Sequence, residues 1–396
     1  MTWIADTATL SDFCRRAAAA PFVTVDTEFM RERTYWAQLC LVQVATADEA
    51  VAIDALAPGL DLSPLFQLLD DPRVLKVFHA ARQDLEIFHH LTGRVPGPLF
   101  DTQVAAMVCG FGDAVSYETL AGQLAGARID KSARFTDWAQ RPLSERQIAY
   151  ALADVTHLRR AYAALAKRLT QTGRAGWLQE EMATLLDPAT YRMDPELAWQ
   201  RLKPRSGKPR LVAVLKEVAA WRERESQRRD TPRNRVLRDE TVMDIAGHAP
   251  TSSDELARMR GLSKGFAEGR LGEEVLEAVR RGLAMPEAEI PVVPQPLDLP
   301  RGIGPIVELL KVLLKMKCDE HDVAQKLVAT TADLERVAAD DHADVPALHG
   351  WRREVFGNSA LALKHGDLAL TLRNKQIVLI VPDEALPQPA AVNARS

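Results

Sequence analysis

The chain reads Phe22-Val23-Thr24-Val25-Asp26-Thr27-Glu28-Phe29 in an early apolar run, and this stretch predicts a strand that carries two acids. Side chains alternate between the two faces of a strand, so Asp26 and Glu28 project from the same face. Two neighbouring carboxylates repel each other, and burial penalises their charge further. A divalent cation such as Mg²⁺ or Mn²⁺ resolves both problems, because hard cations prefer oxygen ligands. For this stretch alone, an exposed strand end with two solvated acids is the alternative.

The residues around this stretch predict an α/β domain. Short runs rich in valine and isoleucine predict strands at residues 22–29, 38–45, 51–56 and 74–79. Residues 63–69 predict a helix with Ser63 as its N-cap, and residues 83–91 predict one that ends at Gly93. A long helix is expected from about 144 to 171. Early strands followed by helices are typical of an α/β fold.

Two further segments carry acids that a metal site needs. Asp84 follows the strand at 74–79 and opens a helix, where an acid either complements the helix dipole or serves as a ligand. Tyr150 and Asp154 are four residues apart in a helical run, so they share one face of the helix. An amphipathic helix with a polar rim is the alternative for this pair. No single segment is diagnostic, but together they predict a metal centre.

Composition limits the class of protein. With 396 residues, 47% hydrophobic and 26% charged, the chain predicts a globular protein of two or three domains. The 4 cysteines form no Cys-x-x-Cys pair, which favours buried thiols in a reducing compartment and hence the cytoplasm. The sequence has no secretion signal and no apolar run long enough for a membrane helix, so we expect no membrane partner.

The rest of the chain is expected to be helical, in two segments separated by linkers. Prolines mark linkers at about 188–208 and 286–300, and helices are expected at 211–282 and 301–380. Residues 237–246 and 329–338 are similar, which raises the question of a repeat. Residues 201–240 carry 13 Lys/Arg against 6 Asp/Glu, whereas residues 1–200 carry 19 against 25. The basic stretch indicates either a nucleic-acid surface or a solvated helix face.

Taken in order, these segments resemble the ribonuclease D family of DEDD-type 3′→5′ exonucleases. The resemblance rests on Val25–Phe29, Arg33-Thr34-Tyr35, His79–Phe88, Asp101-Thr102-Gln103, Asp130-Lys131-Ser132, Thr136-Asp137-Trp138, Arg141-Pro142-Leu143 and Tyr150–Asp154. The tyrosine is typical of the DEDDy branch, because the histidine branch would place His where this chain has Ala149. Residues 205–285 resemble the HRDC domain, and 301–380 resemble a second, degenerate copy.

The resemblance implies a ribonuclease-H-like exonuclease domain, a mixed sheet flanked by helices, followed by two all-α bundles. The implied domains are 1–190, 205–285 and 300–382. In that family Asp26, Glu28 and Asp154 would hold a metal that activates water, with Asp26 bridging to a second metal near Asp84. Tyr150 would orient the water. The implied cofactors are therefore two divalent ions, Mg²⁺ or Mn²⁺, which stabilise the attacking and leaving oxygens of a phosphodiester.

Four other residues are candidates for contact with nucleic acid. Lys131 and Arg134 lie in a loop that leads toward the Tyr150 helix and are suited to hold a phosphate. Gln38 and His79 are weaker candidates, since a histidine at a strand end is usually structural. Solvated loop charges are the alternative for Lys131 and Arg134. Asp101 is expected to be a helix N-cap and not a ligand.

The resemblance implies a metal-dependent 3′→5′ exoribonuclease that releases nucleoside 5′-monophosphates, with tRNA precursors and other structured RNAs as partners and no obligatory protein partner. Two alternatives remain open: an exonuclease acting on single-stranded DNA, and a non-catalytic RNA-binding protein on an exonuclease scaffold. A P-loop motif typical of helicases is missing from the sequence. Only the 2′-hydroxyl separates RNA from DNA, so residue patterns alone do not decide the substrate.

Overall fold

The structure is a computed structural model, and it describes residues 2–130, 136–204, 207–293 and 300–382. The chain folds into two compact units. The first unit comprises residues 1–100, 129–159 and 183–296, and the second comprises 101–128, 160–182 and 297–396. The domain boundaries expected from the sequence stay a prediction.

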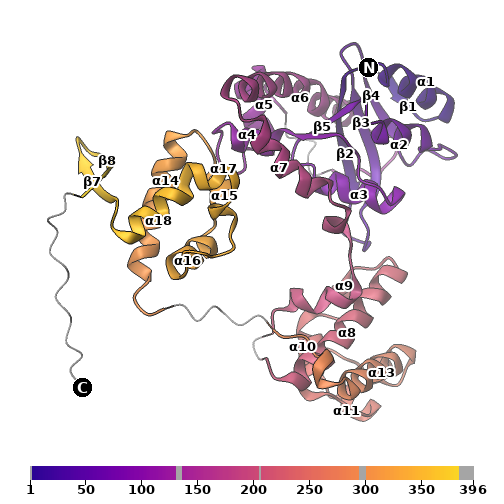
Figure 1. Cartoon of the computed structure of the whole chain (residues 1–396). Coiled ribbons are helices and arrows are strands. Elements are labelled where there is room, and N and C mark those ends of the chain that lie inside the picture. Colours follow the sequence, from indigo (N-terminus) through magenta and orange to yellow (C-terminus); the bar gives the residue numbers. More distant parts are fainter. Residues whose placement is uncertain (1, 131–135, 205–206, 294–299, 383–396) are drawn as a thin grey trace, which may run out of the picture. The chain divides into compact units, whose positions relative to one another are not determined.

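A mixed six-stranded sheet forms the centre of the N-terminal region (Figure 1). Its strand order is β1-β4-β3-β2-β5-β6, with bounds Thr2–Ile4, Ala50–Asp54, Gln38–Ala45, Phe22–Met30, Leu75–Phe78 and Leu99–Asp101. β2–β3 and β3–β4 pair antiparallel, whereas β1–β4 and β2–β5 pair parallel. The four strands expected from the sequence are present. The short strands β1 and β6, of 3 residues each, have too little length for a periodic pattern.

Helices pack around this sheet, with bounds Thr7–Ala17 for α1, Ser63–Asp70 for α2, Arg82–Thr92 for α3 and Glu145–Thr172 for α6. Gly93 ends α3 in the left-handed conformation, at φ 72°, as expected. The expectation that Ser63 is the N-cap of α2 was wrong. Leu62 holds that position, and the Ser63 hydroxyl instead donates to Asp61 at 2.6 Å. The carboxylate of Asp61 is the stronger acceptor, so it receives the hydrogen bond of the Ser63 hydroxyl, and this contact fixes the turn before α2.

The long helix α6 is anchored over one face of the sheet. The Thr24 hydroxyl of β2 donates to the carbonyl oxygen of Val155 at 2.8 Å. Leu152 of α6 belongs to one buried apolar cluster with Leu41 of β3 and Ala52 of β4. Burial of this cluster holds the helix against β3 and β4, and the hydrogen bond of Thr24 holds it against β2. Residues of α6 and β2 that are far apart in the sequence are therefore brought together.

A helical bundle with its own apolar core forms the C-terminal part of the first unit (Figure 1). Its helices are α8 (Pro209–Arg228), α9 (Arg233–Val236), α10 (Asp239–His248), α11 (Ser253–Ala257), α12 (Lys264–Ala267) and α13 (Arg270–Ala284). α8 and α13 pack closely at Gly282, where a Cβ would lie 2.6 Å from the Cα of Val214. The expected linker at 188–208 is partly structured, because 3₁₀ helices η2 (Pro188–Tyr191) and η3 (Pro195–Leu202) occupy it.

The second unit contains a further helical core. Its helices include α4 (Thr102–Val108), α5 (Tyr117–Ala125), α7 (Ala175–Leu186), α14 (Gly304–Glu320), α15 (Gln325–Val328), α16 (Thr331–Ala339), α17 (Gly350–Arg352) and α18 (Asn358–His365). In both helical regions a four-residue helix is followed by a longer one, α9 by α10 and α15 by α16. The longer helices contain most of the similar segments 237–246 and 329–338. Asp101 is the N-cap of α4, as expected, accepting from Gln103 N at 2.8 Å.

The expectation of helix as far as residue 380 was wrong for the last residues of that segment. They form a hairpin of β7 (Ala369–Arg373) and β8 (Gln376–Ile380). Asn374 and Lys375 between the strands have φ values of 50° and 64°, which suit a tight hairpin turn. β-branched residues in 376–380 favour a strand once the turn forms. Within the described part of the chain, none of the helices is long and apolar enough to cross a membrane.

Candidate active site

Three carboxylates from two elements meet at one place. Asp26 and Glu28 lie on β2, and Asp154 lies on α6. Each offers one carboxylate oxygen, and these three oxygens lie within 4.8 Å of one another. Asp154 is buried, while Asp26 and Glu28 are half-buried. The strand alternation and the anchoring of α6 on the sheet together produce this group.

The electrostatics of the group disfavour three bare negative charges. Burial, followed by the charge of Asp154, raises the pKa of Asp26 well above its ordinary value, although the backbone N–H of Thr27 opposes the shift. A nearby cation would reverse this effect, because opposite charge favours the ionised carboxylate. Closely spaced, partly buried oxygen donors are the ligand set that Mg²⁺ or Mn²⁺ prefers. The residues present therefore fit a divalent metal.

Tyr150 lies beside this group on the same helix as Asp154. Burial, and then the charges of Asp154, Glu28 and Asp26, raise the pKa of the Tyr150 phenol, and a side-chain hydrogen bond to Asp154 adds to the shift. The phenol therefore keeps its proton at neutral pH. Its ring lies 6.2 Å from that of Trp138, centroid to centroid. Helical spacing thus places a protonated hydroxyl next to the three acids.

Asp84 is held differently from the other three acids. It is buried in the first turn of α3, and the Thr27 hydroxyl donates a hydrogen bond to its Oδ1. Asp84 is not a member of the group of three that the described residues form. It is linked to that group through Thr27, which lies between Asp26 and Glu28 on β2.

The candidates for nucleic-acid contact are dispersed. Gln38 is exposed at the start of β3, where it pairs with Met30. His79 is half-buried just after β5. Neither belongs to the carboxylate group. Lys131 and Arg134 lie outside the described residues. Their roles stay predictions.

Gln43 and Tyr35 were not among the predicted site residues, although Tyr35 lies in one of the segments that carry the family resemblance. Gln43 of β3 lies directly opposite Asp26 in the antiparallel register, so the two side chains share a face of the sheet. It is fully buried, and its amide atoms make no hydrogen bond to the described residues. A polar residue inside the apolar run at 38–45 was the available signal. Tyr35 makes contacts to residues far along the chain, which leave no local signal.

Comparisons with known proteins agree with this architecture. Residues 1–170 match the family model described as a 3′-5′ exonuclease, and residues 212–279 match the HRDC domain. The fold and the carboxylate group thus define the class: a metal-dependent 3′→5′ exonuclease that carries an HRDC domain.

Similar proteins of known name show to which family of 3′→5′ exonucleases the chain belongs. The chain is 55% identical over 367 residues to ribonuclease D of Gluconacetobacter diazotrophicus, covering 93% of each chain. It is 54% identical over 380 residues to ribonuclease D of Nitrobacter hamburgensis, covering 96% of this chain and 99% of the relative. The chain therefore belongs to the ribonuclease D family, and it is an exoribonuclease.

Solved structures show the same fold. The crystal structure of Escherichia coli RNase D matches with a TM-score of 0.78 and 29% identity, over 92% of this chain and 98% of that one. The catalytic core of RRP6 from Trypanosoma brucei matches with a TM-score of 0.54 and 20% identity, over 71% and 79% respectively. The second likeness concerns the fold alone. The expected ribonuclease-H-like exonuclease fold with helical HRDC region is confirmed.

Proposed function

We propose that this chain removes nucleotides one at a time from the 3′ end of structured RNAs, tRNA precursors among them, and releases nucleoside 5′-monophosphates. The observation that carries the proposal is the meeting of Asp26, Glu28 and Asp154 within 4.8 Å, beside Tyr150. The E. coli RNase D that this chain resembles is described as an exoribonuclease involved in structured RNA processing.

In the proposed site Asp26, Glu28 and Asp154 would hold two divalent ions, Mg²⁺ or Mn²⁺, and Asp84 would support the second of them. Such ions lower the pKa of bound water and stabilise charge on phosphate oxygens. Asp154 also accepts a hydrogen bond from Tyr150. That bond uses the single proton of the phenol and fixes the ring, so the phenol oxygen would accept a hydrogen bond from the attacking water and orient it.

The remaining candidates are assigned to substrate binding. Lys131 and Arg134 would contact phosphates near the scissile bond, and Gln38 and His79 would contact the terminal nucleotides. Charged donors on phosphates fix the register of a strand without reading its sequence. The basic stretch 201–240 is less available than its composition indicates, because Arg222 and Arg233 are engaged in ion pairs inside the bundle region.

The test uses the purified chain with Mn²⁺ and a 5′-labelled RNA that ends in a 3′-hydroxyl. We expect a ladder that shortens by single nucleotides, with 5′-monophosphates as the product, and a loss of about 10³-fold or more in Asp154→Asn. Asp12→Asn, at an exposed residue of α1, is the matched control and should keep full activity. Internal fragments or 3′-monophosphates would contradict the proposal.

A DNA strand of the same sequence decides between RNA and DNA as substrate, and a tRNA precursor with a 3′ extension tests the physiological class. We expect faster shortening of RNA than of DNA, and trimming of the precursor that stops near its folded stem. Tight RNA binding without metal-dependent turnover would instead support a non-catalytic binding protein.

A further inference from the structure

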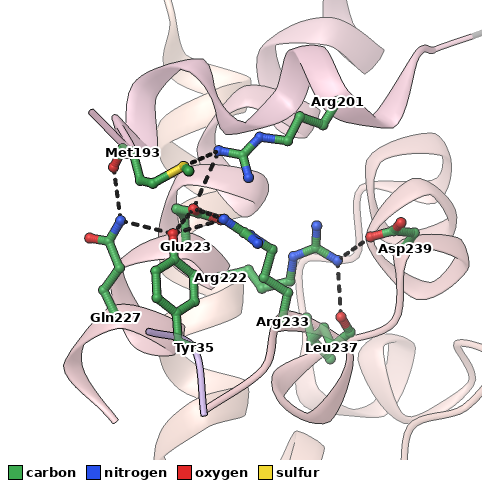
Figure 2. Close-up of polar contacts among 9 residues, drawn as sticks. All are labelled: Tyr35, Met193, Arg201, Arg222, Glu223, Gln227, Arg233, Leu237 and Asp239. Atoms are coloured by element: carbon green, nitrogen blue, oxygen red, sulfur yellow. Dashed lines mark hydrogen bonds and ion pairs between the residues drawn. The ribbon is translucent and has the colours of Figure 1, made fainter. Parts of the chain in front are cut away.

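Tyr35 connects the exonuclease sheet to the helical bundle, and both belong to the first unit. It lies in the loop between β2 and β3, soon after the strand that carries Asp26 and Glu28. Figure 2 shows its hydroxyl pointing at the side of helix α8. The hydroxyl donates to Glu223 and accepts from Gln227 Nε2 at 3.2 Å. It also accepts from Arg233 Nη2 at 2.8 Å.

The partner of Tyr35 is a buried charge. The Glu223 side chain is only 1% exposed and lies between Arg233 and Arg201 (Figure 2). Arg233 donates from Nε and Nη2 to the two carboxylate oxygens, both at 2.6 Å. Burial opposes the charge of Glu223, but the hydrogen bonds from Arg233 and Tyr35 outweigh it and hold the pKa below the ordinary value. The phenol of Tyr35 is therefore one of the hydrogen-bond donors that stabilise the buried carboxylate of Glu223.

The backbone of the same loop is held from the bundle side as well. Asp230, in the turn after α8, accepts from Tyr35 N at 3.0 Å and Trp36 N at 2.9 Å. Asp230 adopts a φ of 45°, an uncommon value for a residue with a side chain. Trp36 in turn stacks on His90 of α3, with ring centroids 3.9 Å apart. The loop is thus fixed to the sheet domain on one side and to the bundle on the other.

Charged side chains are frequent at this junction. A cavity of about 440 Å³ lies there, and half of the residues that line it are charged, such as Arg31, Glu86, Arg201 and Arg222. A gap of this size removes close contacts that would otherwise hold two bodies together. The hydrogen bonds of Tyr35 and Asp230 cross this junction and therefore contribute to the docking. Loss of one partner leaves a buried charge short of a donor.

We infer that Tyr35 is a positioning residue, which docks the helical bundle on the loop after the acid-bearing strand and thereby sets the path of long RNA into the active site. This inference rests on the proposed function. The side-chain hydrogen bonds of Tyr35 are to bundle residues, and Tyr35 is not a member of the carboxylate group of Asp26, Glu28 and Asp154. Its effect should depend on whether the RNA is long enough to reach the bundle.

The experiment compares Tyr35→Phe and Asp230→Ala with the wild type on two substrates. One is an RNA trinucleotide, and the other is a tRNA precursor with an unpaired 3′ extension. We expect KM for the precursor to rise about tenfold in each variant, as for the loss of one charge-assisted hydrogen bond, with kcat nearly unchanged. kcat/KM for the trinucleotide should change less than about twofold. The double variant should be no worse than about the stronger single one, because both act on one junction.

Asp254→Ala, an exposed acid on α11 of the same bundle, is the control with the same change of charge and should match the wild type. Hydrogen exchange at the end of α8 should speed up in both test variants and not in the control. Asp230 is exposed, so its variant keeps the test valid if Tyr35→Phe folds poorly. Equal losses on both substrates, or no loss on either, would overturn the inference. A wild type inactive on both RNAs would instead refute the proposed function.

Discussion

The hydroxyl of Thr27 donates a hydrogen bond to the carboxylate of Asp84. Thr27 lies between Asp26 and Glu28 on β2. The same strand therefore supplies two acids of the carboxylate group and orients Asp84, an acid of α3 that is not part of that group. Asp84 thus depends on β2 for its orientation, although it lies outside the group of three.

Thr27→Val tests this dependence, because valine keeps the β-branched shape and removes the donor. The buried carboxylate of Asp84 loses a hydrogen bond, which costs about 1–3 kcal/mol of the free energy of unfolding. We expect activity to fall about tenfold or more as Asp84 reorients. Chemical denaturation and initial rates measure the two effects. Thr27→Ser keeps the hydroxyl, so its free energy of unfolding and its activity should both stay close to those of the wild type. A Thr27→Val variant indistinguishable from the wild type would contradict the prediction.

Tyr150 and Asp154 should separate proton handling from metal binding. Tyr150→Phe keeps the ring and removes the phenolic hydroxyl that would orient the attacking water, so we expect kcat to fall about 10²-fold. The rise in melting temperature caused by Mn²⁺ should stay as in the wild type, because the three carboxylates remain. Asp154→Asn should abolish most of that rise. If Tyr150→Phe weakened Mn²⁺ binding as strongly as Asp154→Asn, the separate role of the phenol would be wrong.

Gln43 offers a test in which stability and activity move in opposite directions. It faces the same side of the sheet as Asp26, and its buried amide makes no hydrogen bond to the described residues. Replacing an unsatisfied amide by an apolar side chain of similar length is expected to stabilise the fold, so Gln43→Met should raise the free energy of unfolding by about 1 kcal/mol. Because its amide lies beside Asp26, we expect activity to drop. A less stable but fully active variant would contradict both expectations.

Short-range patterns predicted the strands and the pairs of residues that share one face, and long-range contacts account for what these patterns missed. Alternation placed Asp26 beside Glu28, and helical spacing placed Tyr150 beside Asp154, since both rules act within a few residues. The sequence resemblance supplied the link between β2 and α6, which the Thr24–Val155 hydrogen bond makes in the structure. Such a contact leaves no periodic signal.

Two features that the sequence did not predict, the contacts of Tyr35 and the hairpin of β7 and β8, also lack a strong local signal. Tyr35 contacts Glu223 and Asp230 in the bundle, and its local segment Arg33-Thr34-Tyr35 supports the family resemblance without indicating these contacts. The hairpin at the end of the second helical segment depends on two residues with positive φ, Asn374 and Lys375, neither of them glycine. Asn-Lys is a weaker turn signal than Asn-Gly.

Lys76 predicts a pH dependence of stability. The residue is fully buried in β5, and its ammonium donates to the carbonyl oxygens of Asp71, at 2.7 Å, and Gly97. Burial lowers the pKa of Lys76 to about 8, below the value of about 10.4 for an unfolded chain. Between these two pKa values the unfolded chain binds more protons than the folded one, so this residue makes the free energy of unfolding rise with pH.

Lys76→Met removes this contribution. All other titrating groups are the same in both proteins, so their effects cancel when the free energy of unfolding of the variant is subtracted from that of the wild type. From pH 7.5 to 10 the wild type should gain up to about 3 kcal/mol of stability relative to Lys76→Met, at no more than about 1.4 kcal/mol per pH unit. The buried thiols, whose pKa values are raised, act in the opposite direction in both proteins and drop out of the difference. Guanidinium unfolding at steps of half a pH unit measures the slope. A difference that stays constant or falls with pH would show that Lys76 is charged in the folded protein throughout this range.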